Sequence, residues 1–293
     1  MKLSVIIPTK DRPRRLIKLI KTLEKNKFFF NEIIIVDSSN AVNEGYIKEK
    51  LISIKLIIKF IKSKPSIAYQ RNLGIKKTKR DNDYIMFLDD DISFNYSSFR
   101  NMKNFIKKND YIGYSFNISD EKQDSIFDKL KKSKLSKKLG IYDNRIGRVS
   151  PSGWHSKITN VKKNTEVDWL STNAVIYKSN LKINFDNFFS NYSYLEDLDF
   201  SHRARKKGKL VIVNKAKYFH KNFIKRKSFE FGKKELVNRY YFLKKNRLSF
   251  LSFLIASLIF VFLNLVNLKI QRFFGNLFAL LKIILNYFFF IKL

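Results

Sequence analysis

The chain contains no cysteine, which excludes disulfide bonds and catalysis by a thiol. Glycine and proline are also scarce, with 9 and 4 copies among 293 residues. No glycine-rich loop follows the first apolar segment, where Pro8, Thr9, Lys10 and Asp11 stand instead. A P-loop or a dinucleotide-binding fingerprint is therefore not expected.

Acidic residues are few and unevenly placed. The chain has 25 of them against 59 Lys and Arg, a net charge of +34, and none lies beyond residue 235. Residues 221–247 hold ten basic residues and two acidic ones. Such a basic band suits nucleic acid or an anionic membrane surface. Because Lys, Asn, Ile and Phe are abundant throughout the chain, part of this charge reflects composition alone.

Long apolar runs are absent from the start of the chain and present at its end. The run at residues 3–7 is too short for a signal peptide, so we expect the first domain to stay in the cytoplasm. Residues 248–268 carry no charge, and as a helix they would cover roughly 31 Å, which predicts a membrane span. Residues 273–291, interrupted by Lys282, either span or lie in the interface. A buried core helix is the alternative for both segments.

The first half of the chain predicts an α/β fold. Residues 3–7, 33–36, 56–61 and 84–88 are short apolar runs without alternation, as in strands covered on both faces. Residues 14–27 between the first two runs have helical apolar spacing, which gives a βαβ unit. We expect further strands at 167–177 and 210–213, helices at 129–138 and from residue 194, and an insertion over 120–160. The predicted domains are 1–225, a basic linker at 226–247 and hydrophobic helices at 248–293.

Three consecutive carboxylates, Asp89, Asp90 and Asp91, end the fourth predicted strand. Strands of an open α/β sheet present ligand-binding groups at their carboxyl ends. Alternate side chains share a face, so Asp89 and Asp91 can serve one ligand while Asp90 faces elsewhere. Mg²⁺ and Mn²⁺ prefer such oxygen ligands and bridge phosphates. The pattern therefore indicates a metal–phosphate site, with a solvated acidic turn as the alternative.

Other polar residues follow or open predicted elements. Asp37 ends the second strand, where it could hold a nucleobase or ribose, or cap the next helix. Arg71 lies on a turn or helix start, either in a site or in a surface ion pair. His202 is expected to be an exposed helix residue. Trp154 and His155 are either an acceptor-side pair or ordinary packing.

Five segments, SVIIPTKDR, IIIVDSS, AYQRNLGI, FLDDD and YLEDLDFSHRARKKG, occur in this order. Together they resemble the family 2 glycosyltransferases of the GT-A fold over about residues 1–225. The resemblance implies a mixed, mainly parallel nucleotide-sugar-binding sheet flanked by helices. It also implies a role for each matching residue. Pro8 and Asp11 would lie at the donor pocket, Asp37 at the base, Arg71 and Asn72 at the pyrophosphate and sugar, Asp89 at the ribose and metal, and Asp91 and His220 at the metal.

The same resemblance assigns the catalytic and acceptor-side residues. Asp197 matches the catalytic base, with Glu196 beside it and Arg203 on the same helix among the substrate-binding residues. Trp169, Thr172 and Asn173 match the segment that meets the donor sugar and acceptor. The family more often has glycine at that turn, so the sugar is left open.

The chemistry accounts for these residue types. Transfer from a nucleotide sugar needs a departing diphosphate stabilised by Mg²⁺ or Mn²⁺, and a carboxylate base at the acceptor hydroxyl. A single displacement with one base would invert the anomeric carbon. We therefore expect a metal-dependent, inverting glycosyltransferase attached to the inner or plasma membrane, with its catalytic domain in the cytoplasm. Its partners would be a nucleotide-sugar donor and a glycan or lipid-linked acceptor of cell-surface polysaccharide or glycolipid synthesis.

Two other classes of protein remain as alternatives. One is a basic nucleic-acid-binding protein, but no recognised nucleic-acid module is present, and an uncharged segment of 21 residues has no purpose there. The other is a non-catalytic membrane scaffold of the same fold. The presence of Asp89, Asp91, Asp197 and His220 argues against that loss of activity.

Overall fold

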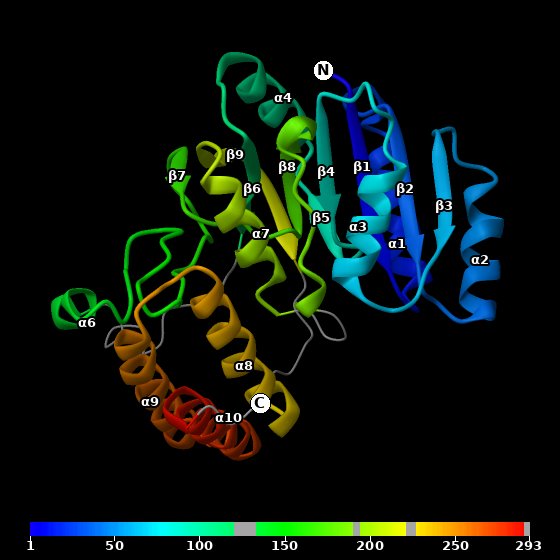
Figure 1. Ribbon diagram of the computed structural model, residues 1–293. Helices are drawn as coiled ribbons and strands as arrows, with labels where there is room; N and C mark the ends of the chain where they lie inside the picture. Colours follow the sequence, from blue (N-terminus) through cyan, green and yellow to red (C-terminus); the bar gives the residue numbers. More distant parts are fainter. Residues whose placement is uncertain (120–132, 190–193, 221–226, 290–293) are drawn as a thin grey trace. The chain divides into compact units, whose positions relative to one another are not determined.

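The structure is a computed structural model that describes residues 1–119, 133–189, 194–220 and 227–289. Its strands form a single sheet (Figure 1). They are β1 (Leu3–Thr9), β2 (Glu32–Asp37), β3 (Ile58–Lys62), β4 (Tyr84–Leu88), β5 (Ile92–Phe94), β6 (Gly113–Ser119), β7 (Thr165–Val167), β8 (Ala174–Lys178) and β9 (Leu210–His220).

The helices flank this sheet or follow it in the chain. They are α1 (Pro13–Glu24), α2 (Ala41–Leu51), α3 (Ile67–Lys77), α4 (Ser98–Lys108), α6 (Lys134–Lys138), α7 (Glu196–Arg205), α8 (Phe229–Lys245), α9 (Phe250–Val266) and α10 (Ile270–Phe289). Short 3-10 turns η1, η2 and η3 occupy Lys27–Phe29, Ser179–Leu181 and Asn187–Phe189.

The chain divides into two compact units. Unit 1 comprises residues 1–120 and 158–221, and unit 2 comprises 121–157 and 222–293. The predicted domain boundary at residue 225 placed 121–157 with the sheet. In the structure, the described part of that insertion packs with the C-terminal helices instead, because Ile141 and Trp154 share one apolar cluster with Leu236, Phe253 and Leu280.

The sheet in unit 1 has the order β3-β2-β1-β4-β8-β6-β9-β5, with β7 paired to β9. The pairs β1–β2, β1–β4, β2–β3 and β6–β9 are parallel. The pairs β4–β8, β6–β8, β5–β9 and β7–β9 are antiparallel. The prediction of a mixed sheet is confirmed. The prediction that it is mainly parallel is confirmed for the described strands. The strands β1, β2, β3, β4, β6 and β9 run in one direction, and β5, β7 and β8 run in the other.

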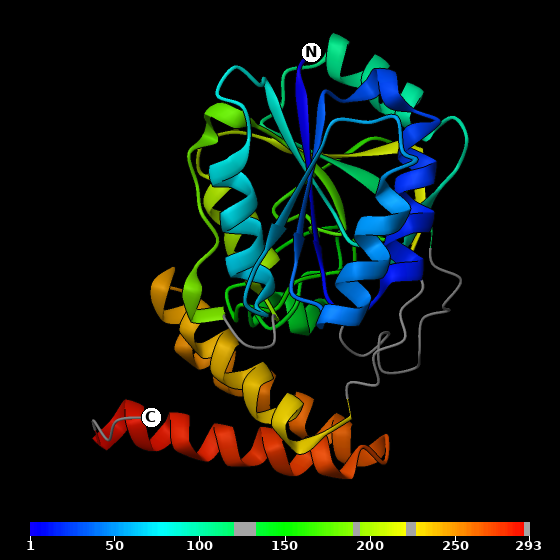
Figure 2. The same ribbon diagram turned by 90° about the vertical axis from the view of Figure 1, so that its right-hand side faces the viewer.

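Helices cover both faces of this sheet (Figure 2). On one face α1, α2 and α4 pack against alternate strand residues such as Leu3, Val5 and Ile7. The other face carries α3, where Gly74 approaches Ile6, and α7, where Phe200 packs against Phe87. Burial on both faces explains why these strands are uninterrupted apolar runs.

Several elements of the structure differ in extent from the predicted ones. The predicted strand at 167–177 is two strands, β7 and β8, joined by a loop at 168–173. The strand predicted at 210–213 continues to His220 as β9. Only α6 represents the predicted helix at 129–138, because residues 129–132 lie outside the described part of the chain.

Unit 2 is held together by close helix packing and a buried ion pair. A methyl group added at Gly275 would lie 2.1 Å from the carbonyl oxygen of Phe229, so α8 and α10 meet backbone to backbone. Near this crossing, Arg272 donates to both carboxylate oxygens of the buried Glu235. Trp154 packs on Phe253 and lies beneath the guanidinium of Arg239, 4.2 Å from its ring centre, which favours ordinary packing for this residue.

None of the helices in the described ranges combines the length with the apolar character that crossing a bilayer demands. This corrects the membrane span predicted over 248–268. The helix there is α9, which has 17 residues and is capped by Ser249. At 1.5 Å per residue it extends about 26 Å, short of the ~30 Å hydrocarbon core. The second apolar segment is α10, which also fails this criterion.

Candidate active site

The carboxyl ends of β1, β2 and β4 meet at one edge of the sheet. Thr9 is in register with Asp37, and β4 ends immediately before Asp89. This edge is where the strands of an open α/β sheet bind ligands. The structure therefore gathers Pro8, Asp37 and the three consecutive carboxylates into one neighbourhood.

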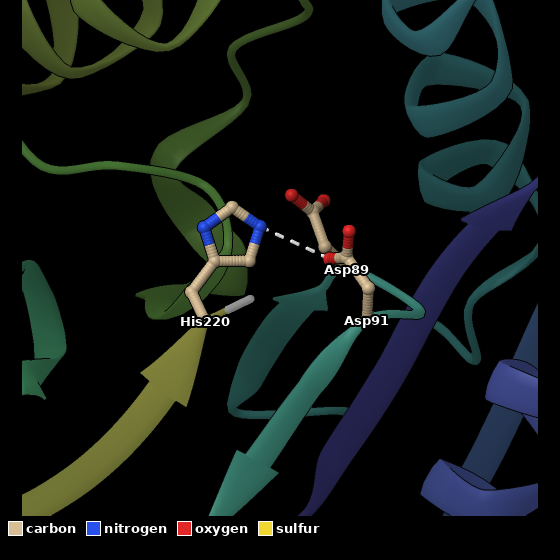
Figure 3. Close-up of side chains that lie close together, drawn as sticks. All are labelled: Asp89, Asp91 and His220. Atoms are coloured by element: carbon tan, nitrogen blue, oxygen red, sulfur yellow. Dashed lines mark ion pairs between the residues drawn. The ribbon is translucent and has the colours of Figure 1, made fainter. Parts of the chain in front are cut away.

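Asp89, Asp91 and His220 form a cluster whose potential ligand atoms all lie within 4.8 Å of one another (Figure 3). His220 Nε2 is 3.0 Å from Asp91 Oδ1. The antiparallel pairing of β5 with β9 produces this contact, because Ile92 is opposite His220. Two half-buried carboxylates and one imidazole are a plausible ligand set for a divalent cation.

The surroundings shift the pKa values of the two cluster carboxylates in opposite directions. Burial raises the pKa of Asp89, against the opposing charge of Arg71. Burial alone would also raise the pKa of Asp91. The hydrogen bond to His220 and the charges of His220, Arg12 and Arg15 outweigh burial and lower this pKa. Asp91 is therefore ionised at neutral pH and ready to act as a ligand.

Asp90 points away from this cluster, as its place in the strand predicts. It accepts a 2.6 Å hydrogen bond from the hydroxyl of Thr9 and a 3.1 Å bond from Arg12 Nη1. Burial raises the pKa of Asp90 to about 6, despite both partners. The same Arg12 nitrogen lies 3.2 Å from Asp91 Oδ2. Arg12 thus ties the start of α1 to the acidic turn.

Arg71 lies inside the protein rather than along an open pocket. Its side chain is 1% exposed, with Nη1 at 3.0 Å from Glu196 and Nη2 at 3.0 Å from Asp89. Both bonds are charge-assisted, and through them Arg71 joins the cluster of Asp89, Asp91 and His220 to the start of α7. A direct contact of Arg71 with a pyrophosphate stays a prediction.

The two neighbours of Arg71 on α3 connect further parts of the site. Gln70 donates to the carbonyl oxygens of Thr9 and Val36, 3.0 Å and 2.7 Å away. Asn72 exchanges two hydrogen bonds with the backbone of Phe185. Sequence reasoning missed Gln70, although a buried amide beside Arg71 and Asn72 in one helical turn is a recognisable signal. The side chain of Asn72 fixes the backbone at Phe185, and its contact with a donor stays a prediction.

The first turn of α7 presents Glu196 and Asp197 in different environments. Leu195 before them has φ 75°, a left-handed conformation that is costly for a residue with a Cβ atom. Glu196 is buried against Arg71, and burial together with the charge of Asp197 raises its pKa to about 7. Asp197 is half-buried and accepts a bond from the amide of Leu198. Asp197 is thus the more accessible carboxylate of the two.

Arg203, predicted among the substrate-binding residues, pairs within the protein. Its guanidinium binds the buried Asp199, with Nη2 at 2.8 Å, and the same nitrogen donates to the carbonyl oxygen of Asn184. This i,i+4 pair stabilises α7. A substrate contact for Arg203 stays a prediction.

Asp11 and Asp37 both accept hydrogen bonds from the short segment that precedes α2. Asp37 is fully buried and accepts bonds from the amide and hydroxyl of Ser39. Asp11, with φ 51°, accepts a bond from the amide of Asn40. The alternative that Asp37 caps a helix is wrong, since Asn40 caps α2.

Trp169, Thr172 and Asn173 lie in the loop between β7 and β8. Trp169 and Thr172 are buried, at 7% and 1% exposure. Asn173 reaches the cluster: its carbonyl oxygen accepts the amide of Asp89, and its side-chain nitrogen is 3.2 Å from His220 Nδ1. Asn173 therefore orients the His220 ring, as outer partners of metal-binding histidines do.

Comparison with known proteins adds a family match. A profile of the family described as "Glycosyl transferase family 2" matches residues 4–182, more than half of the chain. This range contains Asp11, Asp37, Asp89 and Asp91. It ends before Glu196, Asp197 and His220, so the placing of these three residues rests on the geometry above. No curated protein matches the chain.

Solved structures of similar fold include "TarS 1-349" of S. aureus, with a TM-score of 0.50 and 19% identity over 81% of this chain and 65% of that one. The same protein in complex with UDP-GlcNAc gives 0.52 and 18%, over 81% and 66%. GalNAc-T7 with UDP, GalNAc and Mn²⁺ gives 0.57 and 14%, over 76% and 44%. This chain thus spans less than two thirds of each, and at these identities the likeness shows a common fold.

Proposed function

Because the chain belongs to glycosyl transferase family 2, we propose that it moves a sugar from a nucleotide-sugar donor to an acceptor hydroxyl, with a divalent metal and with inversion. The observation that carries this proposal is the cluster of Asp89, Asp91 and His220 at the ligand-binding edge of the sheet. Its two carboxylates, one with a lowered pKa, fit Mg²⁺ or Mn²⁺. When bound, the cation would stabilise the charge of the departing diphosphate.

The residues of α7 would act on the acceptor. In the proposed step the acceptor oxygen forms a bond to the anomeric carbon while the bond from that carbon to the diphosphate oxygen breaks. The diphosphate leaves with the electron pair, and Asp197 takes the hydroxyl proton. Glu196 is bound to Arg71 and is poorly placed to take that proton. One direct displacement inverts the anomeric configuration.

Arg71 would position both halves of this machinery. It holds Asp89 and Glu196 at 3.0 Å each, so the metal cluster and the first turn of α7 share one cation. A buried charge with two hydrogen-bonded partners of opposite sign is strongly oriented. Asn173 would likewise orient His220 through Nδ1.

A uridine nucleotide sugar is the first donor class to test, supported by UDP in solved structures of similar fold. On this proposal Pro8, Asp11 and Asp37 lie on the nucleoside side of the donor. We propose a glycan or lipid-linked precursor of a cell-surface polysaccharide or glycolipid as the acceptor. Such an acceptor would place the reaction at the cytoplasmic face of the plasma or inner membrane.

A panel of uridine, guanosine and thymidine diphosphate sugars would test the proposal. We expect one donor class to release its nucleoside diphosphate in the presence of Mg²⁺ or Mn²⁺, and EDTA to abolish the release. Proton NMR of the transferred sugar should show the inverted anomer. Release that is indifferent to EDTA, or a retained anomer, would contradict the proposal. Release from no donor, with a lipid-linked acceptor extract supplied, would favour a non-catalytic scaffold.

A further inference from the structure

Helix α9 in unit 2 has its polar side chains on the wrong side for a helix that faces water. Its exposed residues are all apolar: Leu251, Leu258, Ile259, Phe262, Leu265 and Val266. Its buried face, by contrast, includes Ser257 and Asn264, at 0% and 3% exposure. Asn264 donates to Asn276 of α10 inside the unit. Ser257 and Asn264 are therefore turned into the protein, and the apolar side chains of α9 are left outside.

Helix α10 also exposes an apolar stripe, bordered by the exposed Gln271 and Lys282. The residues Ile270, Phe274, Phe278, Leu281 and Leu285 are exposed and recur at intervals of three and four, which places them along one face. The opposite face packs into unit 2 through Gly275, Asn276, Ala279, Leu280 and Ile283. An exposed apolar stripe opposite a packed face is typical of a helix that lies on a lipid surface.

Helix α1 of the same chain provides an internal comparison. Its exposed residues are Arg14, Arg15, Lys18 and Lys21, and its buried ones are Leu and Ile. The water-facing side of α1 thus consists of charged residues. The exposed faces of α9 and α10 are apolar instead, so the composition of the chain, which is rich in Lys, does not explain them. Exposed apolar stretches of this extent mark an interaction site.

Charge decides what covers these faces. The residues ahead of α9, Lys244, Lys245 and Arg247, are exposed, and no acidic residue follows Glu235. Lys282 lies at the edge of the α10 stripe, with its ammonium 4.9 Å from the ring centre of Phe278. A second copy of the chain would bring like charges together, which is unfavourable at a net charge of +34. Anionic lipid attracts them, because basic residues near such a surface favour binding.

We propose that the exposed apolar faces of α9 and α10 dock in the plane of an anionic membrane surface, with the neighbouring lysines and Arg247 on the lipid headgroups. The helices lie in the interface and do not cross the bilayer, in agreement with the 17-residue length of α9 and with Lys282 at the edge of the α10 stripe. This inference concerns binding alone and stands independently of the catalytic proposal.

Vesicle flotation with the full chain tests it. The parent should float with vesicles of equal parts phosphatidylcholine and phosphatidylglycerol. It should float less with phosphatidylcholine alone, because the electrostatic attraction is then missing. A variant carrying Phe262→Ser, Phe274→Ser and Leu281→Ser should bind the mixed vesicles on the order of tenfold or more weakly, since apolar contact is lost. These side chains are exposed, so circular dichroism should show an unchanged fold.

A matched variant supplies the control. Phe28, Ile52 and Tyr96 of unit 1 are 86%, 85% and 94% exposed, and Phe28→Ser, Ile52→Ser and Tyr96→Ser together should leave vesicle binding unchanged. The proposal would be overturned if the parent failed to float or if the two variants bound alike. It would also be overturned in favour of a second copy if sedimentation without vesicles gave a dimer that only the first variant dissociates.

Discussion

Three adjacent aspartates in this protein have three different sets of partners. Asp89 contacts Arg71, Asp90 contacts Thr9 and Arg12, and Asp91 contacts His220 and Arg12. Their side chains alternate along an extended segment, so one acidic run can serve both a metal cluster and the anchoring of α1. A difference of environment, rather than of residue type, gives each carboxylate its own protonation behaviour.

The role of the proposed base can be tested separately from that of the proposed metal cluster by one substitution. Asp197→Asn keeps the size of the side chain and removes its basicity, so turnover should fall on the order of a hundredfold or more while donor affinity stays nearly constant. Steady-state kinetics and donor calorimetry on the same preparation measure both. The exposed Glu49→Gln is the matched control and should behave like the parent. A near-parental rate for Asp197→Asn would move the role to Glu196 or Asp199.

Asp90 should make folding stability depend on pH. Its pKa in the folded protein is about 6, raised from 3.8 by burial, so ionisation is less favourable in the folded than in the unfolded chain. Its contribution to stability is therefore present below pH ~4 and is lost as the pH rises towards ~6, by about 3 kcal/mol at most. Asp90→Asn should remove this loss.

Thermal unfolding across this pH window compares the variant with its parent. The advantage of Asp90→Asn over the parent should grow as the pH rises, because only the parent ionises there. Asp110→Asn, at a well-exposed carboxylate, is the control and should follow the parent. Parallel curves for Asp90→Asn and the parent would show that Asp90 ionises equally easily in both states.

At the scale of elements, unit 2 depends on how closely α8 and α10 approach. A methyl group at residue 275 would be 2.1 Å from Phe229 O and 2.9 Å from Lys233 N, both backbone atoms. Gly275→Ala should therefore destabilise unit 2 by roughly 1–3 kcal/mol or more. Gly45→Ala in α2 has open space and should be neutral or stabilising, by up to about 1 kcal/mol. Thermal unfolding by circular dichroism distinguishes them, and equal effects would contradict the close crossing.

The elements that could be predicted from the sequence are those with a strong local pattern. Strands β1, β2 and β4 are unbroken apolar runs, and α1 has regular apolar spacing after Pro13. Helix α2 has only one buried residue, Ile47, and gave no such signal. The segment 167–177 was misassigned as one strand because Trp169 and Leu170 are buried in a loop. Burial alone does not distinguish a packed loop from a strand.

The candidate site was predictable where residues are close in the chain and much less so where they are distant. Asp89 and Asp91 stand out after β4, but Arg71 and Glu196 are separated by 125 positions. No local pattern reveals that both terminal nitrogens of Arg71 form ion pairs with carboxylates of the site. The apolar run at 248–268 predicted a membrane span because it carries no charge. The sequence pattern did not show that Asn264 would be buried against Asn276 of the next helix.

At the scale of the whole molecule, the proposed sugar-transfer site and the proposed lipid surface belong to different compact units. Asp89, Asp91, Asp197 and His220 all lie in unit 1, and α9 and α10 lie in unit 2. Catalysis and membrane docking should therefore be separable by substitution. A variant with altered α9 and α10 faces should keep its turnover with a soluble acceptor, and a cluster variant should keep its vesicle binding.

The central claim is that Asp89, Asp91 and His220 form a metal-dependent nucleoside diphosphate site. Calorimetric titration of the full chain with UDP, with Mn²⁺ and then with EDTA, tests it most directly. The parent should bind UDP much more tightly with Mn²⁺, and Asp91→Asn should lose that gain because a charged ligand is missing. Equal UDP affinity with and without Mn²⁺, or a full Mn²⁺ effect in Asp91→Asn, would contradict the account.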